Sequence, residues 1–269
     1  MFLHCKLVIL MLVLIPDGQG KLRAFLILFD PHNGTNIINC FSSVHAGKVI
    51  GGQEAKPHSR PYMVLLERHM QNGSTIHCGG FLLSDDFVMT AAHCHAKSFT
   101  VILGLHSIHN KNEKVQTINV EQAFPHKDYN GTTYINDVML LKLSFKPNIT
   151  NNVRPIPLAG RGDGSLPKSC TIAGWGATTH EKNGYMSPQL MEVSVTLIKH
   201  DQCARANEYC SQGESGGGKG DSGGPLVCED EKAYGVVSSN YLPDSGTPRI
   251  NRYPKIPDHK SWIDSITKI

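Results

Sequence analysis

Short apolar runs, separated by turn dipeptides, dominate the chain from Val49 onward. Runs of this length, continuous or alternating with polar residues, are typical of β-strands. Turn signals such as Asn72-Gly73 and Asn130-Gly131 lie between them. The predicted strands are Tyr62–Leu66, Gly80–Leu83, Phe87–Met89, Thr100–Leu103, Val138–Leu143, Cys170–Gly174, Gln189–Thr196, Pro225–Cys228 and Ala233–Ser238. This pattern predicts an all-β domain.

Helical periodicity is confined to the end of the chain. Pro257 and Asp258 are residues that favour the first turn of a helix. Trp262, Ile263 and Ile266 follow at spacings that place them on one face. Many short strands with one terminal helix indicate β-barrels or a sandwich.

The N-terminal segment has a different pattern. Nine apolar residues, Leu7 to Ile15, follow Lys6 and end at Pro16. This predicts a signal peptide over residues 1–20 rather than a buried strand, and the run is too short for a transmembrane helix. The small-residue step at Val44-His45-Ala46 offers a cleavage point as late as residue 46. Residues 21–48 are then a pro-segment or an anomalous insertion before a domain at 49–269.

Composition and charge exclude two classes of protein, disordered chains and nucleic-acid-binding domains. The chain has 269 residues, of which 40% are hydrophobic and 18% charged, so a large core is possible and general disorder is excluded. The formal net charge is only +3. Nucleic acid is therefore not an expected partner, because nucleic-acid-binding domains carry strongly basic patches.

Three motifs carry candidate chemistry. Gly220-Asp221-Ser222-Gly223-Gly224-Pro225 places a serine in a glycine-rich loop, whose backbone N–H groups could hold an oxyanion. Thr90-Ala91-Ala92-His93-Cys94 places a histidine after an apolar strand, and Asn136-Asp137 places a carboxylate before another. A histidine, a carboxylate and a serine, each in its own motif, favour nucleophilic catalysis.

With these motifs the chain resembles the chymotrypsin-fold serine proteases from about Val49 to Ile269. The resemblance implies two six-stranded antiparallel β-barrels packed together with a C-terminal helix. It implies that Ser222 is the nucleophile of an acyl-enzyme mechanism, His93 the general base and Asp137 the carboxylate that orients it. The N–H groups of Gly220 and Ser222 match the oxyanion hole. Gly174-Trp175-Gly176 and Ser238 also match the family, which places Ser238 on the strand that pairs with substrate.

The cysteines resemble those of one subgroup. The resemblance implies the disulfides Cys78–Cys94, Cys170–Cys228 and Cys203–Cys210. No cysteine lies in Gly213–Gly220 or after Cys228, so the bridge that braces the primary pocket in most digestive relatives is missing. With Pro57–Met63, this resembles granzymes and mast-cell chymases. The implied protein is secreted or granule-stored and monomeric, has protein substrates and protease inhibitors as partners, and needs no cofactor or membrane anchor.

The primary pocket departs from the family pattern. Gly216, six residues before Ser222, matches the pocket floor, and its lack of charge argues against basic P1 residues. Asn240 stands where relatives have glycine, and Arg249 and Asn251 both compete for the back wall. We expect an aromatic or large aliphatic P1 residue, or an acidic one if Arg249 reaches the pocket. The loop Cys203–Cys210 has about half the usual length, which places its helix and strand in doubt.

Activation is expected at a short junction motif. Gly47-Lys48-Val49-Ile50-Gly51-Gly52 resembles the activation site of the family, with cleavage after Lys48. The new ammonium of Val49 would then pair with Asp221. Because the shortened loop and Asn240 depart from the family, a catalytically inactive binding protein on the same fold remains the alternative. The histidines His93, His95, His106 and His109 lack partners at ligand spacing, so no metal is expected.

Overall fold

The structure is a computed structural model. It describes residues 9–16, 22–30, 34–38, 50–162, 167–179, 185–243 and 247–268. The chain divides into two compact units, Met1–Ala46 and Gly47–Ile269. The first is an antiparallel sheet in the order β1-β2-β3, formed by Ile9–Pro16, Leu22–Asp30 and Gly34–Ile38. The signal peptide over residues 1–20 stays a prediction, because the presence of strand β1 within it does not test whether the chain is cleaved there.

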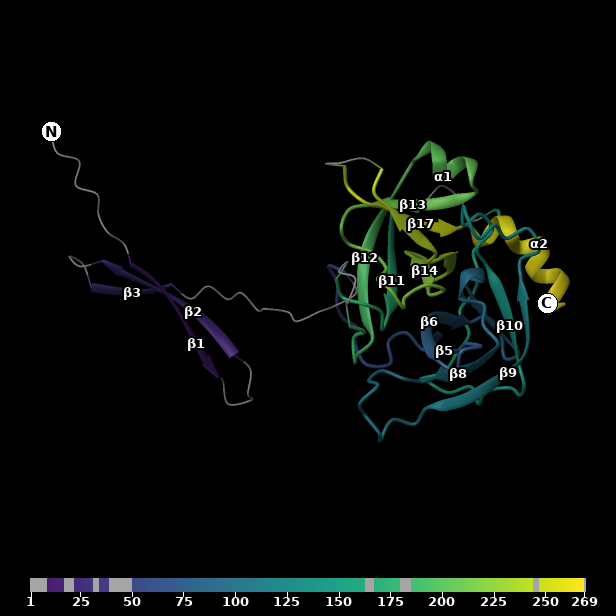
Figure 1. Ribbon diagram of the computed structural model, residues 1–269, viewed down its shortest axis with the longest axis horizontal. Helices are drawn as coiled ribbons and strands as arrows, with labels where there is room; N and C mark the ends of the chain where they lie inside the picture. The colour runs from purple at the N-terminus through teal and green to yellow at the C-terminus, as the bar shows by residue number, and fades with distance from the viewer. Residues whose placement is uncertain are drawn as a thin grey trace. The chain divides into compact units, whose positions relative to one another are not determined.

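The second unit begins with a closed six-stranded barrel in the order β10-β7-β6-β5-β8-β9 (Figure 1). Its strands are β5 Met63–His69, β6 Thr75–Leu82, β7 Phe87–Thr90, β8 Ser98–Leu103, β9 Gln116–Pro125 and β10 Met139–Leu143. Val64, Leu66, Phe81, Val88 and Leu140 are fully buried in its core. Five of these strands follow the predicted apolar runs, and β9 does not, because half of its side chains are exposed and only Ile118 is buried.

The remaining strands form an eight-stranded sheet in the order β15-β14-β11-β12-β13-β17-β16, with β4 paired to β12. Its members are β4 Gln53–Glu54, β11 Ser169–Gly174, β12 Met191–Ile198, β13 Glu208–Gln212, β14 Pro225–Cys228, β15 Ala233–Val236, β16 Ser239–Tyr241 and β17 Ile250–Pro254. An isolated bridge, Gly235 to Lys255, joins its two sides. The expected all-β fold of two packed antiparallel units is confirmed, although only the first closes into a six-stranded barrel and the second is this eight-stranded sheet.

Strand β12 shows why this sequence forms a sheet. Met191, Val193, Val195 and Leu197 are buried and alternate with more exposed side chains. This period of two places one face of the strand on the core and the other toward solvent.

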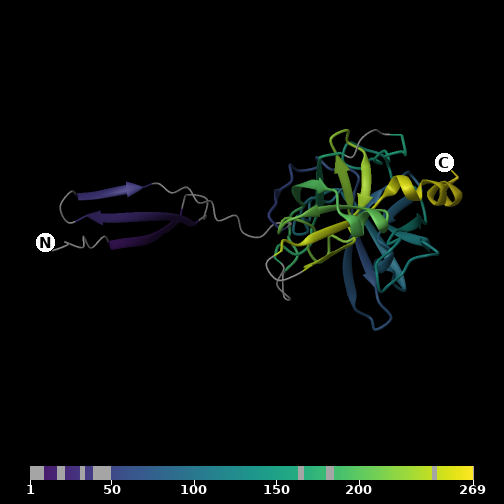
Figure 2. The same cartoon turned by 90° about the horizontal axis from the view of Figure 1, so that it is seen from above.

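The helices are short except at the end of the chain. They are η1 Ala92–Cys94, α1 Asp201–Arg205 and α2 Ile256–Thr267. Helix α2 has Pro257 in its first turn and ends at Lys268, which has a left-handed backbone. Ile263 is buried, and Trp262 and Ile266 pack against the same core, so the predicted face is confirmed. Figure 2 shows α2 at the edge of its unit. Among the described residues, no helix has the length and apolar character needed to cross a bilayer.

Candidate active site

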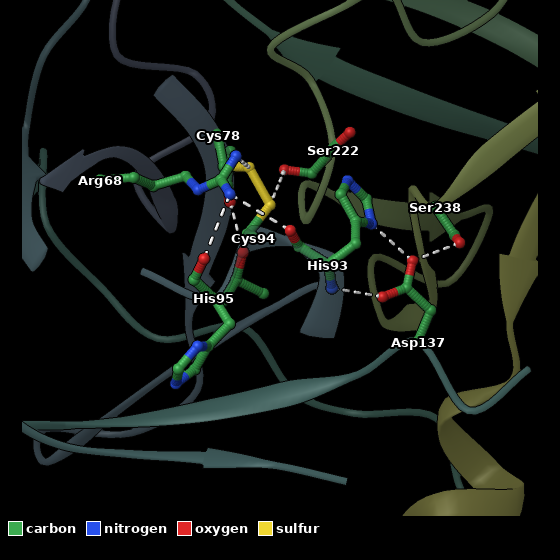
Figure 3. The surroundings of a disulfide bond; sticks show 10 residues. Arg68, Cys78, His93, Cys94, His95, Asp137, Ser222 and Ser238 are labelled. Atoms are coloured by element: carbon green, nitrogen blue, oxygen red, sulfur yellow. Dashed lines mark hydrogen bonds and ion pairs between the residues drawn. A yellow bond between two sulfur atoms is a disulfide. The ribbon is translucent and has the colours of Figure 1, made fainter. Parts of the chain in front are cut away.

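His93 and Asp137 are brought together by two loops of the barrel. His93 lies in the turn η1 after β7, and Asp137 comes shortly before β10. The backbone N–H of His93 donates to Asp137 Oδ1 at 2.8 Å, and its Nδ1 lies 2.7 Å from Asp137 Oδ2 (Figure 3). An ionised carboxylate can only accept hydrogen bonds, so Nδ1 carries the proton and Nε2 keeps its lone pair. The imidazole is thus prepared to accept a proton at Nε2.

Asp137 is completely buried and held by several groups. Ser238 Oγ donates to its Oδ2 at 2.5 Å, beside the bond from His93. The preceding residue, Asn136, has φ of +56°, and its side-chain amide donates to the carbonyl of Asp128 at 3.1 Å. A buried carboxylate is stable only when hydrogen bonds replace water, and His93 and Ser238 supply them, whereas Asn136 fixes the backbone beside it.

Ser222 approaches from the second sheet, in the loop before β14. Its carbonyl accepts a hydrogen bond from the N–H of Gly79 at 2.7 Å, which ties the loop to the barrel. In Figure 3 the imidazole of His93 lies between Asp137 and Ser222. The next residue, Gly223, has φ of +90°, and a Cβ there would overlap Thr90 and Gly79. Glycine is therefore required at 223 for the serine loop to reach the histidine.

Two N–H groups of this loop are open to a ligand. Within the described part of the chain, the N–H of Gly220 and that of Ser222 donate to no acceptor. Gly220 has φ of +104°, a conformation that side chains other than glycine rarely adopt. Paired, free backbone donors next to a serine hydroxyl can stabilise the oxyanion of a tetrahedral intermediate.

Asp221 is buried beneath the serine loop. Its carboxylate accepts hydrogen bonds from the N–H groups of Gly176 at 2.7 Å and Gly218 at 2.8 Å. A Cβ at Gly174 or Gly176 would overlap this carboxylate, which explains both glycines of the Gly-Trp-Gly motif. No cation pairs with Asp221 among the described residues, and burial raises its pKa to about 7. Lys48 and Val49 lie outside the described residues.

This raised pKa predicts a pH-dependent stability for protein that retains Lys48. The folded state holds the Asp221 proton up to about pH 7, whereas the unfolded chain releases it near 3.8. Stability should therefore fall as pH rises from about 4 to about 7, by on the order of 4 kcal/mol. Urea unfolding of a Ser222→Ala protein at several pH values measures the slope. Asp221→Asn is the control, and an equal slope in that variant would contradict the assignment.

A cavity of about 410 Å³ opens beside Ser222. The buried side chain of Asn251 covers Gly216, where a Cβ would come within 2.6 Å of Asn251 Oδ1. Gly216 does not line the cavity, so Asn251 takes the place expected for Gly216. Arg249 also lines it, and its guanidinium donates to Asn240 Oδ1 at 2.8 Å. The two residues considered for the back wall, Arg249 and Asn251, both line the cavity. Asn251 lies over Gly216, and Arg249 lies beside Asn240.

The expected cysteine pairs are all present. The disulfides are Cys78–Cys94, Cys170–Cys228 and Cys203–Cys210. The short loop between Cys203 and Cys210 still contains helix α1 and leads into β13, so the doubt about these elements was wrong. Cys78, His93 and Cys94 lie close enough to resemble a metal site. The two sulfurs are joined to each other, however, and lack the thiolate that a metal requires.

Sequence reasoning missed Arg68, which lies on the far side of the histidine turn from Asp137 (Figure 3). Its guanidinium donates to the carbonyls of His93 and His95, both at 3.2 Å. The sequence shows only the charged pair Glu67-Arg68 after the apolar residues of β5, and nothing in it indicates that Arg68 meets His93.

The fold and this group of residues define a class of protein. A two-layer β domain brings a serine, a histidine and a carboxylate to one loop cluster beside free N–H donors. The family model described as Trypsin matches residues 49–263, and the chain belongs to this family of serine endopeptidases, which are hydrolases acting on protein substrates.

The relatives narrow the subgroup. The chain is 41% identical to "Granzyme B(G,H)" of Mus musculus, over 84% of this chain and 94% of that protein. It is 43% identical to "Mast cell protease 3" of Ovis aries, over 81% of this chain and 88% of the other. A solved structure described as "Structure of GrC" aligns with a TM-score of 0.72 and 41% identity, covering 82% of this chain and all of the other. The resemblance to granzymes and mast-cell proteases is confirmed, and an inactive binding protein is not favoured.

Proposed function

We propose that the protein is a secreted or granule-stored endopeptidase that hydrolyses peptide bonds through an acyl-enzyme on Ser222. His93 accepts the serine proton during attack and later returns it to the leaving amine. Asp137 orients the imidazole, and the N–H groups of Gly220 and Ser222 stabilise the oxyanion. The observation that carries this proposal is the pair of bonds from His93 to Asp137, since they leave Nε2 free on the side of Ser222.

A fluorophosphonate probe tests the proposed nucleophile. The probe reacts with activated serines, so protein processed at Lys48 should be labelled stoichiometrically at Ser222, as located by mass spectrometry of the peptides. A folded, processed sample that stays unlabelled would contradict the proposal. Ser222→Ala serves as the matched control, because it removes one oxygen and leaves the loop glycines in place.

The cavity supports a P1 residue that is not basic. Its lining includes Lys219, Arg249 and Arg252 and no acidic side chain. Arg252 is neutralised by Glu208, with Nε at 2.6 Å from Glu208 Oε2. Arg249 has only the neutral oxygen of Asn240 as a partner for its guanidinium in the described part of the chain. An unneutralised cation in the primary pocket favours an acidic P1 residue over the aromatic one that the sequence alone suggested.

Replacing Arg249 tests this specificity. Arg249→Ala should lower kcat/KM for substrates with P1 Glu or Asp by about 10- to 100-fold, the range for losing a hydrogen bond to a charged group. Matched peptides with P1 Leu are the control and should change less than threefold. A P1-scanned peptide library on the unmodified enzyme gives the starting preference, and a dominant preference for P1 Arg would overturn the pocket assignment.

The activation proposal is that cleavage after Lys48 frees the ammonium of Val49 to pair with Asp221. Ile50, the next residue, is buried, and its carbonyl accepts from the N–H of Gly216 at 3.1 Å. A Cβ at the adjacent Gly217 would lie 3.7 Å from Asp221 Cβ. The chain therefore enters the domain within a few residues of an uncompensated buried carboxylate.

A further inference from the structure

Arg68 contacts the turn of His93 on the side away from Asp137 (Figure 3). It lies on β5, between its strand partners Ile76 of β6 and Phe99 of β8. Its Nη2 donates to the carbonyls of both His93 and His95, and Nη1 donates to Cys78 Sγ at 3.7 Å. The guanidinium thus contacts the backbone of His93 itself and of the second residue after it.

The turn that carries His93 is held by the bond from the His93 N–H to Asp137 and by the Cys78–Cys94 disulfide, but among the described residues only Arg68 donates to the carbonyls of His93 and His95. Turn η1 spans three residues and has no side-chain cap at its start. Carbonyl groups at the end of such a turn lack partners within the turn itself. A planar guanidinium can bind two neighbouring carbonyls at once, which restricts the turn more than a single donor could.

The charge of Arg68 is not neutralised by an acidic side chain. No carboxylate pairs with it in the described part of the chain, and its Nε is buried without a partner. Burial lowers the pKa of the guanidinium, which is nevertheless charged at any physiological pH. The positive charge of Arg68 therefore strengthens its hydrogen bonds to the two carbonyl oxygens.

The contacts of Arg68 extend through the Cys78–Cys94 disulfide to the loop that carries Ser222. The disulfide partner of Cys78 is Cys94, whose Sγ lies 3.8 Å from the carbonyl oxygen of Ser222. Arg68, the disulfide and the Ser222 carbonyl therefore form one continuous set of contacts. A displacement of Arg68 would act on the backbone of the base and of the nucleophile together.

We propose that Arg68 is a positioning residue that fixes the turn of His93 and so holds its imidazole beside Asp137 and Ser222. The inference rests on the proposed roles of His93 and Ser222. The other groups facing the imidazole are Asp137, at Nδ1, and Tyr134, whose ring meets it edge-on at 5.5 Å. The Glu208–Arg252 ion pair lies farther away, near Asp137, and is neutral overall.

The experiment compares Arg68→Met, which removes the charge, with Arg68→Lys, which keeps it. We expect Arg68→Met to lower kcat about 10-fold with KM within twofold, because the imidazole is misplaced while the substrate pocket is unchanged. Arg68→Lys, whose ammonium can still donate to carbonyl oxygens, should recover kcat to within about threefold of the unmodified enzyme. Arg154→Met is the matched control, because Arg154 is exposed and distant in sequence from the site.

A second readout does not depend on activity. The NMR resonance of the His93 Nδ1 proton, which bonds to Asp137, should move on Arg68→Met in a Ser222→Ala background and return on Arg68→Lys. Were the unmodified enzyme inactive, the proposed function would fail while this resonance still tested Arg68. An unchanged kcat and an unchanged resonance in Arg68→Met would overturn the proposal. A loss of kcat that Arg68→Lys does not recover would overturn it as well, since lost packing explains that result. Thermal unfolding of each variant establishes that it is folded.

Discussion

Ser222→Ala and His93→Ala should each lower kcat more than about a thousandfold while the protein stays folded. A serine hydroxyl is a weak nucleophile at neutral pH, so removing either the oxygen or its base removes the covalent route. The oxyanion donors at Gly220 and Ser222 remain, and they should support only a small residual rate. Hydrolysis of a peptide ester and of an amide, followed under single-turnover conditions, measures both losses.

The double variant provides the control for this prediction. Ser222 and His93 act in the same step, so removing the second residue after the first costs no further activity. The double variant Ser222→Ala/His93→Ala should therefore have a kcat no lower than that of the slower single variant. Far-ultraviolet circular dichroism should be unchanged, because His93 and Ser222 are both only partly buried. Peptide hydrolysis at the normal rate in either variant would refute the assigned roles.

Processing at Lys48 should have the second largest effect. Protein that retains Lys48 should show at most about 1% of the activity of protein that begins at Val49, because a buried carboxylate without its cation costs roughly 3–5 kcal/mol. Asp221→Asn should cause a similar loss in the processed enzyme, since it removes the partner of the new ammonium. N-terminal sequencing of the active form, combined with titration of active sites, measures both quantities.

The control for processing is Lys48→Gln, which changes the cleaved residue and nothing in the domain. This variant should resist proteases that cut after basic residues and stay weakly active. Full activity from protein that still carries Lys48, or from processed Asp221→Asn, would show that this switch is wrongly assigned.

The sequence predicted the three candidate catalytic residues more completely than the strands and pocket that surround them. His93, Asp137 and Ser222 each lie in a local motif, and all nine predicted apolar runs overlap strands of the domain. Strand β9 was missed because half of its side chains are exposed and only Ile118 is buried. Strand β16 was missed because none of its three side chains is buried, and β17 because the polar Asn251 and Arg252 interrupt its buried Ile250 and Tyr253.

The pocket and Arg68 could not be predicted for a different physical reason. Asn251 covers Gly216 only because β13 and β17 pair in a register that places Ser211 opposite Asn251, and register depends on partners distant in sequence. Arg68 reaches the His93 carbonyl across 25 positions of sequence, and its own segment gives no sign of that partner.

The hairpin β16–β17 couples specificity to chemistry at one residue and leaves two others free to vary. Asn240, Asn251 and Arg252 belong to it and line the cavity. Arg252 donates to the carbonyl of Thr133, in the loop between β9 and β10 that leads to Asp137. Substitutions at Arg252 therefore act on the catalytic loop, whereas Asn240 and Asn251 have no such contact among the described residues. Duplicated copies of this chain are therefore expected to diversify their targets through Asn240 and Asn251 while the hydrolytic machinery stays the same.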